Sequence, residues 1–243
     1  LYQCDAMLED VVMDSNFSIT PTHFNTGAFT ATYCNVVMDT VVITRNIADQ
    51  GAAINTNSSD ITIKNSLIAQ NIALDDGGAI YSYGCDFKII NTTIADNEAD
   101  VASIFSLYNN FLFLNSILWN EDDVELYYSH SNGGDSHSDF AYTNIRGMDA
   151  NIVESGNGDV SWMDGNLEVN PLFNDSENLD YTLFPNSPMI DAATNYFELD
   201  GSVVIDYNSD EYYGLKPDMG AFEYDPLTNV KNPEITESNF TVY

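Results

Sequence analysis

Residues 52–71 read AAINTNSSDITIKNSLIAQN, and residues 78–97 read GAIYSYGCDFKIINTTIADN. The two stretches match position by position: small residues before an Ile, an Asp before an alternating apolar run, and a closing Asn. Weaker copies of the same pattern extend over residues 27–120. A motif that recurs at a fixed interval of this size predicts a solenoid, in which each copy forms one rung of a stack.

Two independent columns of residues set the register of the repeat. The first contains Asn35, Asp60, Asp86 and Asn110, and the second contains Phe29, Ile54, Ile80 and Ile104. Both columns recur after 25, 26 and 24 residues. Extending the first column back by 25 residues aligns residues 10–13 (Asp-Val-Val-Met) with residues 35–38. The same step places Cys4 one interval before Phe29, in the inward column.

Each copy carries three short apolar segments, such as residues 52–54, 61–63 and 66–68. Their period of two, their β-branched residues and the Gly, Asn and Asp between them predict strands. Three short strands in 24–26 residues form one coil of a parallel β-helix. A leucine-rich repeat of similar length would show fixed Leu positions and a helical segment, and the sequence has neither. We therefore predict an all-β fold, with regular rungs over residues 1–126.

The chain is strongly acidic, with 38 acidic and 6 basic residues and a formal net charge of −32. This balance argues against nucleic acid and anionic membrane surfaces as partners, because both attract basic residues. It suits a secreted protein, a high-salt habitat or divalent-cation binding, and the alternative is a solvated acidic surface with no such role. No apolar run is long enough to span a bilayer. No charged n-region precedes Leu1, so we expect no signal peptide in this sequence. Because Cys4 falls one interval before Phe29, the sequence opens inside a rung, and we expect a processed or truncated segment of a longer product.

The register also predicts how the Cys and Asn residues are placed. Cys34 and Cys85 fall in one column with Ser59 between them, two rungs apart, which is too far for a disulfide. All three cysteines are therefore expected to fill space as small apolar residues. Two Asn columns occupy corners, where Asn tolerates left-handed backbone conformations and can stack into an amide ladder. They contain Asn65, Asn91 and Asn115, and Asn46, Asn71 and Asn97.

The repeat resembles the right-handed parallel β-helix repeats of bacterial secreted proteins, which share a fold with the polysaccharide lyases. The resemblance covers residues 1–170. A later set of motifs resembles the C-terminal portion of surface-anchored β-helix proteins: residues 165–173, 180–183, 187–191 (Ser-Pro-Met-Ile-Asp) and 217–224 (Pro-Asp-Met-Gly-Ala-Phe-Glu-Tyr). Members of that group commonly carry an Arg between the last two motifs, where this chain has only Lys216. The resemblance implies a secreted or bacterial cell-surface protein.

The regular period ends near residue 126. Residues 127–139 are rich in Ser, Gly, His and Asp, which predicts a loop leaving the solenoid. Irregular strands are expected at 140–145 and 159–162. The motifs from Pro171 onward are expected to cover the open end of the stack, since an open β edge invites pairing with another chain. We therefore assign 127–224 to irregular rungs, a loop and a C-terminal cap, and 225–243 to a linker or tail.

The register gathers an aromatic patch from distant positions. Outward positions of adjacent rungs hold Tyr81, Tyr83, Phe105 and Tyr108, with Tyr127 and Tyr128 expected at the border. Flat rings beside Asp and Asn suit sugar stacking, and these six residues are the candidate carbohydrate-binding site. The alternative is that the 127–139 loop folds over the patch and buries it.

Alternating oxygen ligands suggest a metal site nearer the C-terminus. Asp206, Asn208 and Asp210, followed by Asp218, resemble the opening of a Ca²⁺ loop. Glu211 stands where such a loop needs Gly, and Pro217 stands where it needs Glu. An acid-rich turn is the alternative. Ca²⁺ is the only cofactor that the sequence suggests.

The sequence gives little support for catalysis. A lyase needs a basic proton abstractor, and the candidates are Arg45, Lys64, Lys88 and Arg146. A glycoside hydrolase needs paired carboxylates, which carry little information in so acidic a chain. We therefore expect a structural, adhesive or glycan-binding module with a glycan or another cell-surface component as partner. The alternatives are a polysaccharide lyase or glycoside hydrolase, and a subunit of an extracellular fibre that joins end to end with copies of itself.

Overall fold

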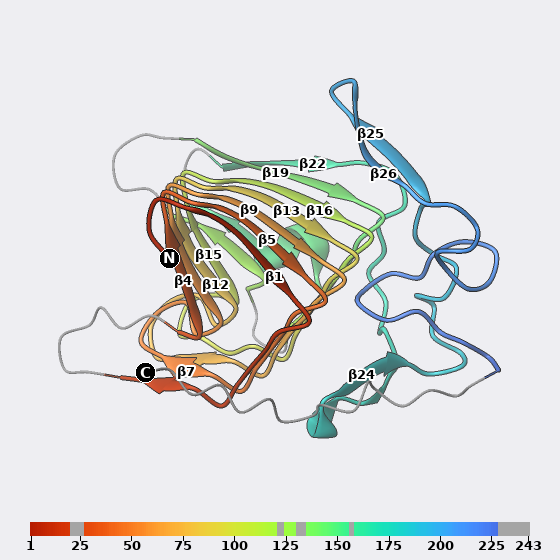
Figure 1. The fold of residues 1–243 in the computed structure, drawn as a ribbon, viewed down its shortest axis with the longest axis horizontal. Helices are drawn as coiled ribbons and strands as arrows, with labels where there is room; N and C mark the ends of the chain where they lie inside the picture. Colours follow the sequence, from red (N-terminus) through yellow and green to blue (C-terminus); the bar gives the residue numbers. More distant parts are fainter. Residues whose placement is uncertain (20–26, 121–123, 130–134, 156–157, 228–243) are drawn as a thin grey trace.

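The computed structural model describes residues 1–19, 27–120, 124–129, 135–155 and 158–227. Parallel strands stack into a β-helix of about five turns, which confirms the predicted fold class and a rung of roughly 25 residues (Figure 1). The predicted register is confirmed for both columns of residues 29–110, because Ile54 pairs with Ile80 and Asp60 with Asp86. None of the described helices is long and apolar enough to cross a membrane.

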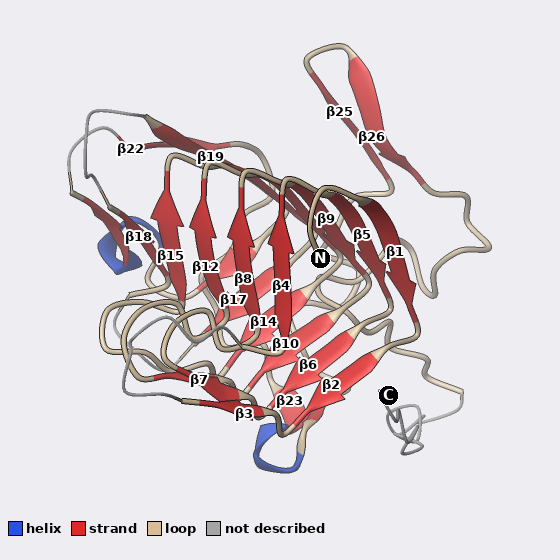
Figure 2. Cartoon of the chain, turned by 60° about the vertical axis from the view of Figure 1, so that its left-hand side comes forward, coloured by secondary structure: helices blue, strands red, loops and turns tan. Residues whose placement is uncertain are grey.

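Four parallel sheets form the walls of the solenoid (Figures 1 and 2). Sheet 1 contains β1 (Asp5–Glu9), β5 (Asn35–Asp39), β9 (Asp60–Lys64), β13 (Asp86–Ile90), β16 (Asn110–Leu114), β19 (Ser136–Ala141) and β22 (Gly158–Trp162). Sheet 2 contains β2 (Val12–Asp14), β6 (Val42–Thr44), β10 (Leu67–Ala69), β14 (Thr93–Ala95), β17 (Ile117–Trp119) and β20 (Asn144–Ile145).

Sheet 3 contains β4 (Phe29–Thr32), β8 (Ile54–Asn57), β12 (Ile80–Tyr83), β15 (Ile104–Leu107), β18 (Leu126–Tyr128) and β21 (Ile152–Glu154). Sheet 4 is short and contains β3 (Phe17–Ser18), β7 (Ile47–Ala48) and β11 (Ile72–Ala73). A complete rung therefore runs from sheet 3 through sheets 1 and 2 to sheet 4. Two 3-10 helices (Met148–Asn151 and Ser176–Asn178) are the described helical segments.

Inward-facing apolar columns fill the solenoid, because alternate residues of each strand point to opposite faces. Ile residues dominate the middle rungs, and aromatic rings take over toward the C-terminal rungs. There Phe113 stacks on Phe140 with ring centroids 4.7 Å apart, and Phe140 stacks on Trp162 at 4.8 Å. The core is one continuous apolar column along the axis.

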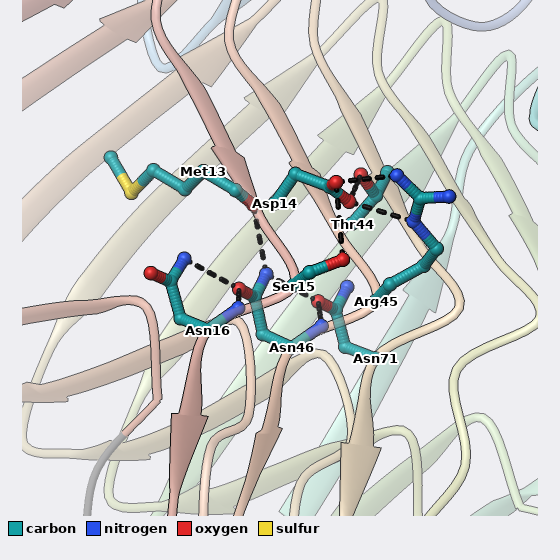
Figure 3. A network of polar contacts seen from close by, with 8 residues as sticks. All are labelled: Met13, Asp14, Ser15, Asn16, Thr44, Arg45, Asn46 and Asn71. Atoms are coloured by element: carbon teal, nitrogen blue, oxygen red, sulfur yellow. Dashed lines mark hydrogen bonds and ion pairs between the residues drawn. The ribbon is translucent and has the colours of Figure 1, made fainter. Parts of the chain in front are cut away.

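The buried asparagine ladder is confirmed. The side-chain amide of Asn46 donates to Asn71 Oδ1 at 2.8 Å, and Asn71 donates to Asn97 Oδ1 at 2.8 Å. Each of these oxygens also accepts the backbone N–H of the preceding rung's Asn. Figure 3 shows the N-terminal part of the ladder, where Asn16 joins it. The other Asn column has positive φ values of 52°, 45° and 53° at Asn65, Asn91 and Asn115, as corner geometry predicts.

The predicted register of the first rung is wrong. Met7 pairs with Val37, and Val12 pairs with Val42 in sheet 2. The interval between these rungs is 30 residues instead of 25, because more residues connect β3 to β4 than connect β7 to β8. Cys4 consequently leaves the Phe29 column and stacks on Cys34. Cys34 and Cys85 lie two rungs apart with Ser59 between them, as predicted, so they cannot bridge each other.

The solenoid also continues further than predicted. Residues 126–128 form β18, and residues 136–141 form β19, both in register with the preceding rungs. The expected 127–139 loop is therefore wrong at both ends, and its residues 130–134 lie outside the described residues. The sequence obscured these rungs because an insertion lengthens the interval from Asn110 to its partner His137.

Residues 171–224, here called the flanking segment, pack on the solenoid but along its side instead of across its end. They include two antiparallel pairs, β23 (Phe173–Asp175) with β24 (Asp180–Leu183), and β25 (Tyr196–Leu199) with β26 (Ser202–Asp206). Leu179 and Tyr181 cover Leu67, Ala69 and Ala95 on the outer face of sheet 2. The stretch 225–227 is described, and the predicted tail beyond it lies outside the described residues.

Candidate functional site

Tyr81, Phe105 and Tyr127 form a column on the outer face of sheet 3, as the register predicts, but their rings stack on one another. Tyr81 lies parallel to Phe105 with centroids 5.3 Å apart and 1° between the planes, and Phe105 lies parallel to Tyr127 at 5.3 Å and 11°. The ring faces therefore point along the solenoid axis and cover each other. Phe105 is 8% exposed. A column of this kind stabilises the stack and presents ring edges outward, which is a poor platform for sugar stacking.

Tyr128 does not belong to this surface. It is fully buried inside the solenoid, and its hydroxyl donates to Ser138 Oγ at 2.6 Å. Burial raises the pKa of this phenol well above its ordinary value. The register explains why Tyr128 is buried. Tyr127 pairs with outward-facing Phe105, and successive residues of a strand point to opposite faces, so Tyr128 points inward.

Tyr83 and Tyr108 form a separate aromatic pair at a corner of the rung. Their rings meet edge to face with centroids 5.4 Å apart, and Tyr83 is 43% exposed. Tyr83 ends β12, and Asp86 begins β13 on the other side of the corner. The pair therefore lies beside Asp86, on the outer face of sheet 1. Tyr83 is the most exposed ring of the predicted patch.

Three acidic residues, Asp75, Asp76 and Asp100, lie beside the aromatic column. Burial, reinforced by the neighbouring charges of Asp75 and Asp100, raises the pKa of Asp76 to about 6. Burial and the charges of Asp76 and Asp75 raise the pKa of Tyr81. These shifts follow from acids crowded at one turn of the solenoid.

The predicted Ca²⁺ ligands do not converge. Both carboxylate oxygens of Asp218 are engaged with the backbone, accepting from the N–H groups of Asp191 and Tyr224 at 2.7 and 2.6 Å. Asn208 donates instead to Glu211 at 3.0 Å, while Asp206 and Asp210 are exposed. Across the part of the chain that the structure describes, no group of three or more His, Cys, Asp or Glu residues is arranged to hold a metal ion. The acid-rich turn is the better interpretation.

Asp218 belongs instead to a cluster of carboxyl groups in the flanking segment. Its backbone N–H donates to Glu223 Oε1 at 3.0 Å, and the backbone of Leu215 donates to Asp191 at 2.6 Å. Burial raises the pKa of Asp218 to about 6, and burial together with the charge of Asp218 raises the pKa of Glu223 to about 7. Lys216 also contributes its backbone N–H to Asp191, so backbone donors hold this carboxylate.

Three of the four basic candidates are engaged. Arg45 pairs with Asp14 (Figure 3), Lys64 pairs with Asp39 at 2.8 Å, and Arg146 donates to the backbone carbonyl of Asn120. Lys88 is exposed, and no carboxylate among the described residues lies within ion-pair distance of its ammonium group. Of these four candidates, it is the one whose side chain remains available to a ligand.

Lys88 lies in a groove that the sequence did not reveal. The groove encloses about 480 Å³ between the outer face of sheet 1 and the turn of the β25–β26 hairpin. Its polar side chains on sheet 1 are Asp60, Thr62, Asp86, Lys88, Asn110, His137 and Asp139. Leu199, Asp200 and Val203 line the hairpin side. The hairpin reaches this position because Ile205 packs on Ile90, Leu112, Leu114 and Ala141, the outward apolar residues beside the polar columns.

His137 is held rigidly at one end of the groove. Its ring nitrogens contact Asp159 at 2.7 Å and Asp139 at 3.0 Å. Partial burial disfavours the charged imidazolium, but the two carboxylates outweigh that effect and raise the pKa of His137. The His137 ring is therefore held in place between two rungs, and its protonated form is favoured. Lys88 is the flexible cation of the site.

The groove matches ligands that repeat at the spacing of the rungs. Asp60, Asp86 and Asn110 are in-register partners on adjacent strands, so their side chains recur about every 4.8 Å. The Asn110 amide donates to Asp86 Oδ1 at 2.7 Å, which fixes the pair. Comparisons with family models, with curated protein sequences and with solved structures find no match to this chain, so the geometry of the groove is the basis for its function.

Proposed function

We propose that this chain is a secreted or cell-surface β-helix module that binds a neutral polysaccharide along the groove of sheet 1. The observation that supports it most directly is the polar column of Asp60, Asp86 and Asn110, open beside unpaired Lys88. Carboxylate and amide oxygens accept hydrogen bonds from sugar hydroxyls, and an ammonium group donates to sugar oxygens. The repeat of the column suits a polymer that lies along the solenoid axis.

Charge selects among polysaccharides. Four aspartates line the groove against Lys88 and a His137 that is already held by two carboxylates. A polyuronate or a sulfated glycan would be repelled at such short range. A neutral or amino-sugar polymer avoids this cost. Tyr83, at the adjoining corner, extends the surface with one partly exposed ring.

The test is a binding measurement on immobilised glucans, mannans, xylans, chitin-type polymers and polyuronates. We expect the chain to bind a neutral or amino-sugar polymer, and Asp86→Asn or Lys88→Ala to weaken binding tenfold or more. Asp164→Asn is the matched control, since Asp164 is exposed and lies outside the groove. The proposal fails if no such polymer binds, or if Asp86→Asn and Asp164→Asn bind equally well.

A glycoside hydrolase is the second candidate function. Asp60 and Asp86 are paired across adjacent strands, which places their backbones about 4.8 Å apart. Retaining glycosidases separate their two carboxyl groups by about 5–5.5 Å. The acidic groove favours a hydrolase over a lyase, whose uronate substrates it repels. Release of reducing ends from a polymer that binds, and its loss in both Asp60→Asn and Asp86→Asn, would support catalysis over binding alone.

The predicted location and the predicted assembly of this chain do not depend on ligand binding in the groove. An extracellular or bacterial cell-surface location stays a prediction that cell fractionation with surface labelling would check. End-to-end association of copies into a fibre also stays a prediction. Sizing across a concentration series, with negative-stain images, would detect it.

A further inference from the structure

Cys4 and Cys34 occupy the same position on adjacent rungs. Their Sγ atoms lie 3.0 Å apart, and both thiols are unbridged. Cys4 precedes β1 and Cys34 precedes β5, whose first residues, Asp5 and Asn35, are direct partners in the sheet. Neighbouring parallel strands hold paired Cα atoms about 4.8 Å apart, which lies within the range that a disulfide spans.

We propose that Cys4 and Cys34 form a disulfide that locks the first rung of the solenoid to the second. The juxtaposition does not depend on flexible loops, because backbone hydrogen bonds fix both residues. The Asn35 N–H donates to the Cys4 carbonyl at 2.9 Å, and the Cys34 N–H donates to Ser59 Oγ at 3.1 Å. The third cysteine, Cys85, lies beyond Ser59 in the same column and cannot reach Cys34.

The environment suits exchange with a disulfide oxidant. Cys4 is half-buried on the first described rung, and Cys34 is 3% exposed beneath it. Burial opposes ionisation of the Cys34 thiol, but hydrogen bonding with Cys4 and with the backbone outweighs it and lowers the pKa of Cys34. The same hydrogen bond raises the pKa of Cys4. The more accessible sulfur meets the oxidant, and the more acidic sulfur completes the bond.

The chemistry balances with a small-molecule or protein disulfide as the oxidant. The Cys4 thiolate attacks one sulfur of the oxidant, which forms a mixed disulfide and releases one thiol. The Cys34 thiolate then attacks the Cys4 sulfur of the mixed disulfide and releases the second thiol. Two cysteine thiols are oxidised, the oxidant gains two electrons and two protons, and its disulfide becomes two thiols.

The bond would restrain the first described rung. Among the described strands of sheet 1, β1 pairs with β5 alone, whereas β5 pairs with both β1 and β9. A crosslink between residues 30 apart closes a long loop and removes many unfolded conformations. We therefore expect it to suppress fraying of β1 and β2 more than it changes the middle rungs.

The first test is thiol counting. The chain is exposed to oxidised glutathione, denatured and alkylated, and its intact mass is measured with and without prior reduction. The proposal expects one alkylated cysteine before reduction and three after it. Non-reducing peptide mapping should join Cys4 to Cys34. Three alkylated thiols after oxidation, a Cys85 linkage or a purely intermolecular bond would each overturn it.

Serine variants supply matched controls. Ser59 occupies the Cys34 column on the next rung, so serine is compatible with this position. Cys4→Ser and Cys34→Ser should each abolish the internal bond, whereas Cys85→Ser should keep it. Hydrogen exchange of β1 amides should slow by on the order of tenfold or more on oxidation of the wild type and of Cys85→Ser. Equal exchange in the oxidised and reduced wild-type chains would refute the restraint.

Discussion

The side-chain amide of Asn120 donates to the buried carboxylate of Glu125 at 2.6 Å, and the backbone N–H of Asn120 donates to its other oxygen at 2.8 Å. Asn120 itself accepts from Asn97, so this carboxylate ends the ladder that runs through the solenoid. In the preceding rungs, each Asn donates to the side-chain oxygen of the Asn in the next rung. For Asn120, the carboxylate of Glu125 provides the acceptor instead.

Glu125→Gln should destabilise the chain. A glutamine offers one oxygen and one NH₂ group, so one of the two Asn120 donors would face another donor. We expect a loss of about 1–3 kcal/mol in the free energy of unfolding, measured by urea denaturation. Glu154→Gln is the control, because Glu154 is exposed. Equal unfolding free energies for the two variants would contradict this role of Glu125.

Asn71→Ala should cost more than an exposed Asn substitution. The Asn71 side chain donates to Asn97 and to the carbonyls of Ile43 and Ala69, and it accepts from Asn46. Removing it leaves several buried groups without partners, at about 2–4 kcal/mol in total. Asn110→Ala removes an exposed amide and should cost within about 0.5 kcal/mol. Urea midpoints of the two variants would show whether the ladder contributes this stability.

Gly78→Ala should be severe although neighbouring rungs carry Ala in the same column. A Cβ at Gly78 would lie 2.4 Å from the Glu98 carbonyl oxygen, a backbone atom that cannot move freely. We expect a loss of at least about 2 kcal/mol, at the scale of overpacked cores. At Gly84 the nearest atom to an added Cβ is 3.8 Å away, but φ is +61°. Gly84→Ala should therefore cost only about 1–2 kcal/mol. Thermal melts of both variants test this order.

Glu223 should make stability depend on pH. Its pKa is raised from 4.5 to about 7 in the folded chain, so the folded state binds the proton more tightly than the unfolded state. Its contribution is fully present below about pH 4.5 and is lost as pH rises through about 7. Relative to the wild type, Glu223→Gln should lose less stability between these pH values. Parallel urea titrations, with Asp164→Asn as control, measure the difference; an unchanged pH slope in Glu223→Gln would contradict it.

The register of the middle rungs was predictable because equal intervals put equal residue types on one another. Asn46, Asn71 and Asn97 form the ladder that their spacing indicates. The first rung was not predictable in this way, because the extra residues between Ser18 and Phe29 shift it by an odd number. The five extra residues move Cys4 from the predicted Phe29 column to the Cys34 column, and both columns face the core.

The groove was less accessible to prediction than the rungs. Asp60 and Asp86 were already visible in one column, but the repeat alone does not show what covers that face. The β25–β26 hairpin lies outside the repeat, and only tertiary packing of Ile205 places it there. For the aromatic patch, the repeat correctly aligned Tyr81 with Phe105. It could not show that the two rings face each other.

The flanking segment changes how the solenoid can come apart. It contacts successive rungs through Gln70 to Ser176, Tyr181 to Asp96 and Gly220 to Asn115. A bare stack of rungs would melt one unit at a time from either end, because each rung contacts only its neighbours. Here the bound segment must detach before the rungs beneath it can separate. We therefore expect the rungs beneath this segment to unfold as one cooperative block.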